Sequence, residues 1–148
     1  MTKMSQHERR AQRLRQNGLK ATGPRLSILE VLEEDSGHPT ADALHERLRD
    51  EHPSLSLSTV YKTLEVFLRT GLCRRVAGDG VRLRVDGALL DHDHAVCRGC
   101  GRIFDVDRGL FPRAAVPTAL PGGMAVTAVR LEYEVVCPDC ERRGVHQK

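Results

Sequence analysis

The sequence predicts an α+β protein, with an N-terminal winged helix-turn-helix followed by a small α+β domain that a four-cysteine zinc site holds together. Three features support this fold class. The first part shows helical spacing of apolar residues and then a Gly-rich hairpin, the second part shows short alternating strands, and two C-x-x-C pairs lie among those strands. We therefore expect one domain at residues 1–85 and another at residues 86–148.

The first two helices are predicted from their end signals. One spans residues 5–17 and ends at Gly18, because glycine readily takes the left-handed conformation that terminates a helix. The next has its start at Thr22 to Arg25, with Pro24 at the first helical position, and ends in the acidic run at residues 33–35. The chain carries a net charge of only +3, but basic residues gather at this end. That arrangement indicates an anionic partner such as nucleic acid, and a solvated basic helix is the alternative.

A turn and a third helix follow. His38 is predicted to be extended, because the ring of Pro39 disfavours the α region for the residue before it. Thr40 is expected to cap a helix at residues 41–50, with Ala43 among its inward-facing side chains.

The strongest helical pattern lies at residues 56–70, where Ser56 can cap the start and Gly71 can close the end. Residues 73–76 and 81–85 then flank a Gly-Asp-Gly turn and predict a hairpin. Helices followed by a hairpin in this order form a winged helix-turn-helix, whose last helix enters the major groove while the hairpin arginines face phosphates. A small helical interaction module is the alternative, but the arginines favour double-stranded DNA.

The second domain is predicted to contain strands at residues 95–96, 103–106 and 125–136, with a short helix at residues 109–116. Aromatic residues make up only 3% of the chain and Trp is absent, so little bulk is available for a large core. A structural metal would compensate for this. Cys73 lies outside the metal motifs and is expected to be a small core residue.

Two C-x-x-C pairs indicate a closed tetrahedral site for structural Zn²⁺, in which no position remains for a substrate. Two disulfides are the alternative, but they need an oxidising compartment. The charged segment 1–19 lacks the apolar stretch of an export signal, and no apolar run is long enough to span a bilayer. We therefore expect a cytoplasmic protein without a membrane partner. The four ligands are Cys97, Cys100, Cys137 and Cys140.

A second set of candidate ligands lies beside the first C-x-x-C pair. It combines two imidazoles with carboxylates, which suits Fe²⁺, Mn²⁺ or Zn²⁺ and can leave a coordination position open. A solvated acidic turn with surface histidines is the alternative. The set comprises His92, His94, Asp86, Asp91, Asp93 and Asp105.

Four segments resemble the ferric uptake regulator (Fur) superfamily, and together the resemblance covers nearly the whole chain. They are the entry helix at residues 19–32, the H-P-T-A turn at 38–41, the S-T-V-Y-K-T-L segment at 58–64 and the H-x-H-x-x-C-x-x-C core within 91–101. The resemblance implies a metal-dependent, homodimeric, DNA-binding transcriptional repressor whose second domain dimerises. It therefore implies a double-stranded DNA operator as partner, no small organic substrate and no enzymatic activity.

Within the superfamily, the chain is most similar to the peroxide-sensing (PerR) branch. The resemblance implies a regulatory site for Fe²⁺ or Mn²⁺, whereas iron-sensing members carry glutamates at the two aspartate positions and zinc-sensing members use a cysteine. Five ligands leave one face of Fe²⁺ open to hydrogen peroxide, and the oxidised ligand would be His38 or His92. The implied ligands are His38, Asp86, His92, His94 and Asp105.

The resemblance also implies which residues touch DNA and which metal site is missing. Iron-sensing relatives carry a histidine of a further metal site where this chain has Val129, so that site is expected to be incomplete. Asp91 and Asp93 are then expected beside the ligands or in solvent. The implied DNA-contacting residues are Arg25, Thr59, Tyr61 and Lys62, with the hairpin arginines on phosphate.

Two other functions compete with a peroxide-responsive repressor. A manganese or iron homeostasis repressor of the same superfamily would use the same ligands without a redox role. A small zinc hydrolase or deaminase would use His92, His94 and a third ligand. The H-x-E signature of zinc deaminases is absent, since His94 stands where the glutamate would be, and such an enzyme leaves the predicted DNA-binding half without a purpose.

Overall fold

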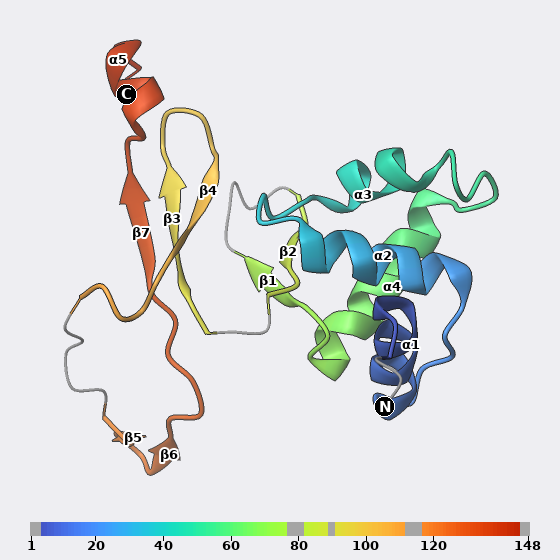
Figure 1. Cartoon of the computed structure of the whole chain (residues 1–148). Helices are drawn as coiled ribbons and strands as arrows, with labels where there is room; N and C mark the ends of the chain where they lie inside the picture. The colour runs from blue at the N-terminus through green and yellow to red at the C-terminus, as the bar shows by residue number, and fades with distance from the viewer. Residues whose placement is uncertain (1–3, 77–81, 89–90, 112–116, 146–148) are drawn as a thin grey trace. The chain divides into compact units, whose positions relative to one another are not determined.

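The computed structural model describes residues 4–76, 82–88, 91–111 and 117–145 (Figure 1). The chain divides into two compact units, Met1–Leu89 and Leu90–Lys148, so Asp86 belongs to the N-terminal unit rather than to the second domain. Among the described residues, no helix is both long enough and apolar enough to cross a membrane.

The N-terminal unit has the predicted winged helix-turn-helix order of helices followed by an antiparallel strand pair (Figure 1). The predicted Gly-Asp-Gly turn between the two strands lies outside the described residues. The elements are α1 (Gln6–Gln16), α2 (Gly23–Glu34), α3 (Ala41–Leu48), α4 (Leu57–Thr70), β1 (Arg74–Val76) and β2 (Arg84–Asp86).

Local capping explains where these helices begin and end. The Ser56 side chain accepts a hydrogen bond from the backbone N–H of Thr59 at 3.2 Å, and α4 ends at Gly71, which has a φ of 76°. Thr40 caps α3 in the same way, but α3 ends at Leu48, two residues before the predicted end. Thr22 occupies the N-cap position of α2 without a side-chain hydrogen bond to the helix.

The apolar faces of the four helices pack into one core. Its centre contains side chains from each of these four helices, as expected for helices with one apolar face. Cys73 is buried in this core, as predicted, and burial raises the pKa of its thiol to about 12. Ala43 is exposed instead of inward-facing, because Ala41 takes the buried position at the start of α3. The fully buried side chains include Leu14, Ile28, Leu29, Leu44, Val60, Leu64 and Phe67.

The prediction that His38 is extended is wrong. Its φ is +55°, and it is the one non-glycine residue with positive φ among the described residues. Histidine is among the side chains that enter this region more often than most. Its imidazole is 1% exposed, and its Nδ1 lies 2.7 Å from the Ser36 carbonyl oxygen.

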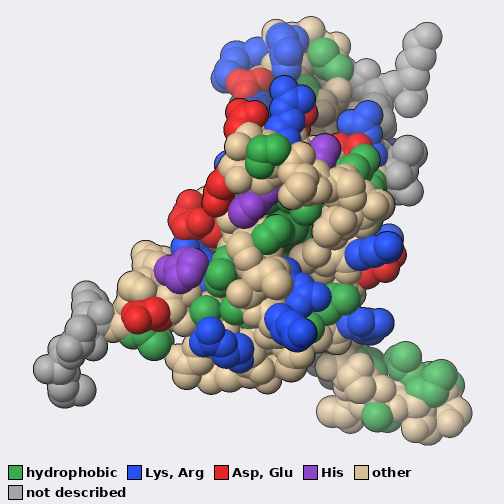
Figure 2. Space-filling model, turned by 90° about the vertical axis from the view of Figure 1, so that its right-hand side faces the viewer, with side chains coloured by type: hydrophobic (Ala, Val, Ile, Leu, Met, Phe, Trp, Pro, Cys, Tyr) green, Lys and Arg blue, Asp and Glu red, His purple; other side chains and the backbone are tan. Residues whose placement is uncertain are grey.

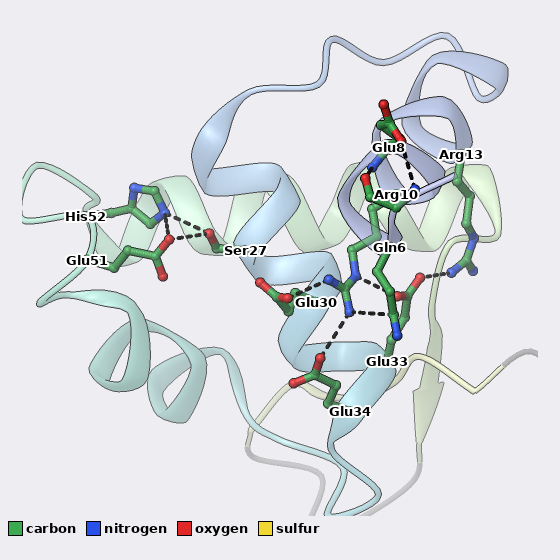
Figure 3. Close-up of polar contacts among 11 residues, drawn as sticks. Gln6, Glu8, Arg10, Arg13, Ser27, Glu30, Glu33, Glu34, Glu51 and His52 are labelled. Atoms are coloured by element: carbon green, nitrogen blue, oxygen red, sulfur yellow. Dashed lines mark hydrogen bonds and ion pairs between the residues drawn. The ribbon is translucent and has the colours of Figure 1, made fainter. Parts of the chain in front are cut away.

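A buried arginine joins α1 to the end of α2 (Figure 3). Arg10 is 6% exposed, and its guanidinium contacts the carboxylates of three glutamates on one face of α2. Because one cation neutralises several neighbouring acidic groups, the contact fixes the position of α1 and the acidic end of α2 together. The three glutamates are Glu30, Glu33 and Glu34.

The C-terminal unit contains a three-stranded sheet in the order β4-β3-β7, a small hairpin and a short helix (Figure 1). Strand β3 pairs antiparallel with β4 and parallel with β7. The elements are β3 (Asp93–Cys97), β4 (Ile103–Val106), β5 (Ala119–Leu120), β6 (Met124–Ala125), β7 (Glu132–Val135) and α5 (Pro138–Arg142).

Two predictions for this unit differ from the structure. The predicted strand at residues 125–136 is interrupted, because β3 has only five residues and pairs with only the last part of that segment, β7. Residues 109–111 of the predicted helix are not helical, and residues 112–116 lie outside the described residues.

The described part of the C-terminal unit has a very small core. Its buried cluster consists of three cysteines with Val135 packed against it, while many large apolar side chains lie on the surface. A unit of this kind needs a metal, a partner surface or both to be stable. The exposed apolar side chains are Phe104, Leu110, Phe111, Leu120, Met124, Leu131, Val136 and Val145.

We predict that Arg10→Ala lowers the free energy of unfolding by about 1–3 kcal/mol, because three glutamates lose their shared cation while solvent still screens them. Urea unfolding followed by helical circular dichroism measures the change. Arg9→Ala is the matched control, since Arg9 is exposed and donates only to the Met4 carbonyl among its described contacts. Equal midpoints for the two variants would contradict a structural role for the Arg10 cluster.

Candidate metal centres

Four cysteine sulfurs converge in the C-terminal unit from the two C-x-x-C pairs. All four lie within 4.8 Å of one another, and none forms a disulfide. Cys100 Sγ and Cys137 Sγ are 3.8 Å apart. A tetrahedron with Zn–S bonds of about 2.3 Å has edges of about 3.8 Å, so the geometry fits Zn²⁺ with all four positions filled by sulfur. The ion would join the turn after β3 to the start of α5.

The thiols of this cluster differ in acidity. The backbone N–H of Cys137 donates to Cys97 Sγ at 3.2 Å, and this hydrogen bond lowers the pKa of Cys97 to about 6. Burial together with the neighbouring sulfurs raises the pKa of Cys140 to about 12. Without a cation the four sulfurs would therefore not all be ionised at neutral pH, whereas zinc binding deprotonates its thiol ligands.

Arg102 lies directly against the sulfurs. Its Nε donates to Cys100 Sγ at 3.5 Å and its Nη2 to Cys137 Sγ at 3.4 Å. Asp139 orients the same guanidinium through Nη2, and the Phe104 ring lies beneath it at 5.6 Å. These contacts raise the pKa of Arg102, so it stays charged and offsets part of the negative charge of a zinc tetrathiolate. One signal for this role is visible in the sequence, because Arg102 stands two residues after Cys100.

The second group of ligands in this unit comes from the residue before β3, from β3 itself and from β4. Nε2 of His92 is 3.0 Å from Nε2 of His94, and the two rings are edge to face. Asp105 on β4 is the register partner of His94, and its Oδ1 lies 3.3 Å from His92 Nε2 and 3.9 Å from His94 Nε2. Two imidazole nitrogens and one carboxylate oxygen therefore converge, as a metal that prefers mixed nitrogen and oxygen ligands requires.

The N-terminal unit contributes two further candidate ligands. His38 and Asp86 are both buried, and a ligand atom of each lies within 4.8 Å of the other. A carbonyl oxygen only accepts hydrogen bonds, so the contact with Ser36 places the proton on Nδ1 and the lone pair on Nε2. Metal-binding histidines use this arrangement to fix the tautomer. The side chain of Asp86 accepts from the backbone N–H of Ala88 at 2.8 Å.

The two additional aspartates have different environments. Asp91 is exposed, as expected for a solvated group, but Asp93 is buried and only 3% exposed. Arg108 forms ion pairs with both of them. The sequence carried no signal for this contact, because Arg108 reaches the aspartates only through the pairing of β3 with β4.

The candidate DNA-contacting residues lie in the N-terminal unit. Thr59 and Lys62 are exposed near the start of α4, and the half-buried Tyr61 donates its hydroxyl to Asp42 Oδ2 at 3.2 Å. Arg25 donates to the Lys20 carbonyl at 3.2 Å near the start of α2. Figure 2 shows Lys and Arg side chains in several groups on the face that it presents, with acidic groups among them. The basic charge is therefore divided into separate groups on this face.

Comparison with known proteins identifies close similarities. The model of the "Ferric uptake regulator family" matches residues 16–134. The peroxide operon regulator of Bacillus subtilis is 34% identical over 133 residues, which cover 90% of this chain and 92% of that protein. The peroxide-responsive repressor PerR of Staphylococcus saprophyticus is 30% identical and covers 86% of each chain. The structure of the ferric uptake regulator Fur of Helicobacter pylori, described as having three functional metal-binding sites, aligns with a TM-score of 0.70 at 21% identity, over 95% of this chain and 97% of that one, and shows the same fold.

We predict that Arg102→Gln accelerates the transfer of zinc to a coloured chelator by roughly tenfold, because loss of its charged N–H···S contacts makes the sulfurs more reactive. Arg142→Gln is the control, since Arg142 pairs with Asp139 and is more exposed. Stopped-flow absorbance measures both rates. Identical rates for Arg102→Gln and wild type would show that the contacts do not protect the zinc site.

Proposed function

Since the chain belongs to the ferric uptake regulator family, we propose that it is a metal-dependent, DNA-binding transcriptional repressor that responds to hydrogen peroxide. The observation that carries the proposal is the convergence of His92, just before β3, with His94 on β3 and Asp105 on β4. The carboxylate of this cluster comes from an aspartate, Asp105. Iron-sensing members of the family carry a glutamate at this position. The similarity to peroxide regulators also supports membership of the peroxide-sensing branch of the family.

The proposed regulatory site uses ligands from both units. The C-terminal unit supplies His92, His94 and Asp105, and the N-terminal unit supplies His38 and Asp86. When bound there, Fe²⁺ supplies the chemistry by which one oxygen atom of hydrogen peroxide is added to a ligand imidazole while the other leaves as water. The chain fixes which nitrogen of His38 can bind and holds the His92 ring beside its neighbours. His38 and His92 are the proposed oxidation sites.

Regulation follows from ligands that lie in different units. Metal binding by all five groups would favour one arrangement of the two units. The DNA-competent conformation would be stabilised by the difference between its metal-binding free energy and that of the other conformation. Oxidation of a ligand histidine removes a nitrogen donor, weakens the site and withdraws that stabilisation. The repressor would then leave its double-stranded DNA operator. Mn²⁺ would support DNA binding without this oxidation.

Contact with the operator is assigned to the start of α4 and to α2. Thr59, Tyr61 and Lys62 lie near the N-terminal end of α4, the end of a recognition helix that enters the major groove, where side chains can meet base edges or phosphates. Arg25 and the arginines of β1 and β2 would contact phosphates. These interactions occur on cytoplasmic DNA and need neither an enzymatic reaction nor a small organic substrate.

The C-terminal unit is the proposed homodimerisation domain. Its large apolar side chains are exposed while its buried cluster is very small. Covering them with a second copy would remove apolar surface from water and supply stability that the isolated unit lacks. A dimer also places two recognition helices on successive turns of one DNA face.

The test of peroxide sensing is mass spectrometry of the protein loaded without oxygen with Fe²⁺ or with Mn²⁺, before and after a brief dose of hydrogen peroxide. We expect one added oxygen on the peptide containing His38 or His92, only in the iron form, together with loss of operator binding. His92→Ala should lose metal-stimulated DNA binding in both forms. If the iron form keeps unmodified histidines and full DNA binding, the protein is a metal-homeostasis repressor without a redox role.

A second prediction concerns DNA contact. Lys62→Ala should weaken binding to all DNA sequences alike and reduce the slope of log K against log[salt] by about one, because one phosphate contact and its released counterion are lost. Arg69→Ala is the control, since Arg69 is exposed on the last turn of the same helix. Fluorescence anisotropy at several salt concentrations measures both variants. A changed sequence preference with an unchanged slope would make Lys62 a base reader instead.

A further inference from the structure

Arg108 joins three segments of the C-terminal unit through its guanidinium. Nη1 pairs with Asp91 Oδ2 at 3.2 Å, Nε pairs with Asp93 Oδ1 at 3.2 Å, and Nη2 donates to the Val129 carbonyl at 3.3 Å. Arg108 itself follows β4, Asp93 is the first residue of β3 with Asp91 just before it, and Val129 lies before β7. Each guanidinium nitrogen therefore contacts a different oxygen atom, and the one planar group links the segments that meet at this end of the sheet.

This contact is needed because Asp93 carries a buried charge. Its side chain is only 3% exposed, whereas that of Arg108 is 25% exposed. A buried carboxylate is tolerated when a cation and hydrogen bonds compensate for lost solvation. The bidentate reach of arginine suits two carboxylates better than the point charge of lysine. The guanidinium thus fixes the charge and the position of the first residue of β3.

Asp93 lies between two proposed metal ligands. Successive side chains of a strand point to opposite faces, so the Asp93 side chain leaves one face of β3 while that of His94 leaves the other. The backbone N–H of His94 donates to the Leu131 carbonyl at 3.4 Å, two residues from the carbonyl that Arg108 holds. Fixing Asp93 from behind therefore fixes the strand segment that presents His92 and His94 to Asp105.

The zinc cluster lies at the other end of β3, where Cys97 is the last residue of the strand. The two ends of the strand are therefore held by different means, sulfur ligands at one end and a guanidinium at the other. Few buried apolar side chains assist, since the only apolar residues that the described part of the unit buries besides its cysteines are Ala95 and Ile103. The orientation of the histidine ligands then depends more on an ion pair than on hydrophobic packing.

We propose that Arg108 is a positioning residue for the regulatory metal. Its fixed positive charge occupies the carboxylates of Asp91 and Asp93, so that His92, His94 and Asp105 are the groups that this unit offers to the ion. The inference rests on the proposed function of that cluster. Ordering residues behind metal ligands typically contribute ten- to hundredfold to metal affinity, so we expect an effect of roughly that size.

The test is a double-mutant cycle on the zinc-loaded full chain, measured by isothermal titration with Mn²⁺ in the absence of oxygen. We expect Arg108→Gln to weaken Mn²⁺ binding by at least roughly tenfold, because the buried Asp93 carboxylate loses its cation. The double variant Asp93→Asn/Arg108→Gln keeps a neutral hydrogen-bonding pair and should recover affinity to within about threefold of wild type. Zinc content should be unchanged throughout.

Hydrogen exchange gives a readout that does not depend on Mn²⁺. The amides of β3 near Asp93 should exchange faster in Arg108→Gln and return toward wild-type rates in the double variant, while those next to Cys97 stay protected. Arg98→Gln is the matched control, since Arg98 follows the other end of β3 and forms an exposed pair with Glu134 at 3.4 Å. It should leave both affinity and exchange near His94 unchanged.

The outcomes separate this inference from the proposed function. Wild-type Mn²⁺ affinity in Arg108→Gln, with lost affinity in His92→Ala, would overturn the positioning role alone. Multiplicative losses in the double variant would also overturn it, because the two residues would then act independently. Wild-type affinity in His92→Ala would overturn both the regulatory site and the inference that rests on it.

Discussion

The convergence of four cysteine sulfurs is the contact on which the C-terminal unit depends. Its buried cluster consists of three of those cysteines with Val135 against it, while large apolar side chains of the same unit lie on its surface. So small a core cannot by itself offset the conformational entropy lost on folding. A zinc ion that joins the end of β3 to α5 adds its binding free energy to folding. The strands β3 and β4, which carry His94 and Asp105 and follow or face His92, depend on that connection.

Arginine side chains provide further long-range connections in both units. Arg10 fixes α1 to the acidic end of α2, Arg102 contacts the sulfurs, and Arg108 closes the opposite end of the sheet. Each uses several donors of one planar group, which lysine cannot do. In a chain with 3% aromatic residues, such contacts do part of what large side chains do elsewhere. The contacts of Arg102 and Arg108 do not include a ligand histidine, so oxidation of one histidine would leave them in place.

The backbone at His38 connects the fold to the proposed function. A positive φ in a non-glycine residue costs of order 1–3 kcal/mol and persists where the surrounding structure fixes it. Here the imidazole is buried, its Nδ1 proton is held by Ser36, and Asp86 lies close by. The orientation of this ligand is therefore set before any metal binds. A side chain that is already held in place loses less conformational entropy when it binds a metal ion, so His38 is preorganised as a ligand.

The sequence by itself determined the features that depend on neighbouring residues. The two C-x-x-C pairs, the Ser56 cap and the Gly71 end of α4 are local signals, and each predicted its element correctly. The tertiary structure alone decided the positive φ of His38, the interruption of the strand before β7 and the partners of Arg108. Those features depend on contacts between residues far apart in the chain, whose energies outweigh local preference and leave no pattern in the adjacent sequence.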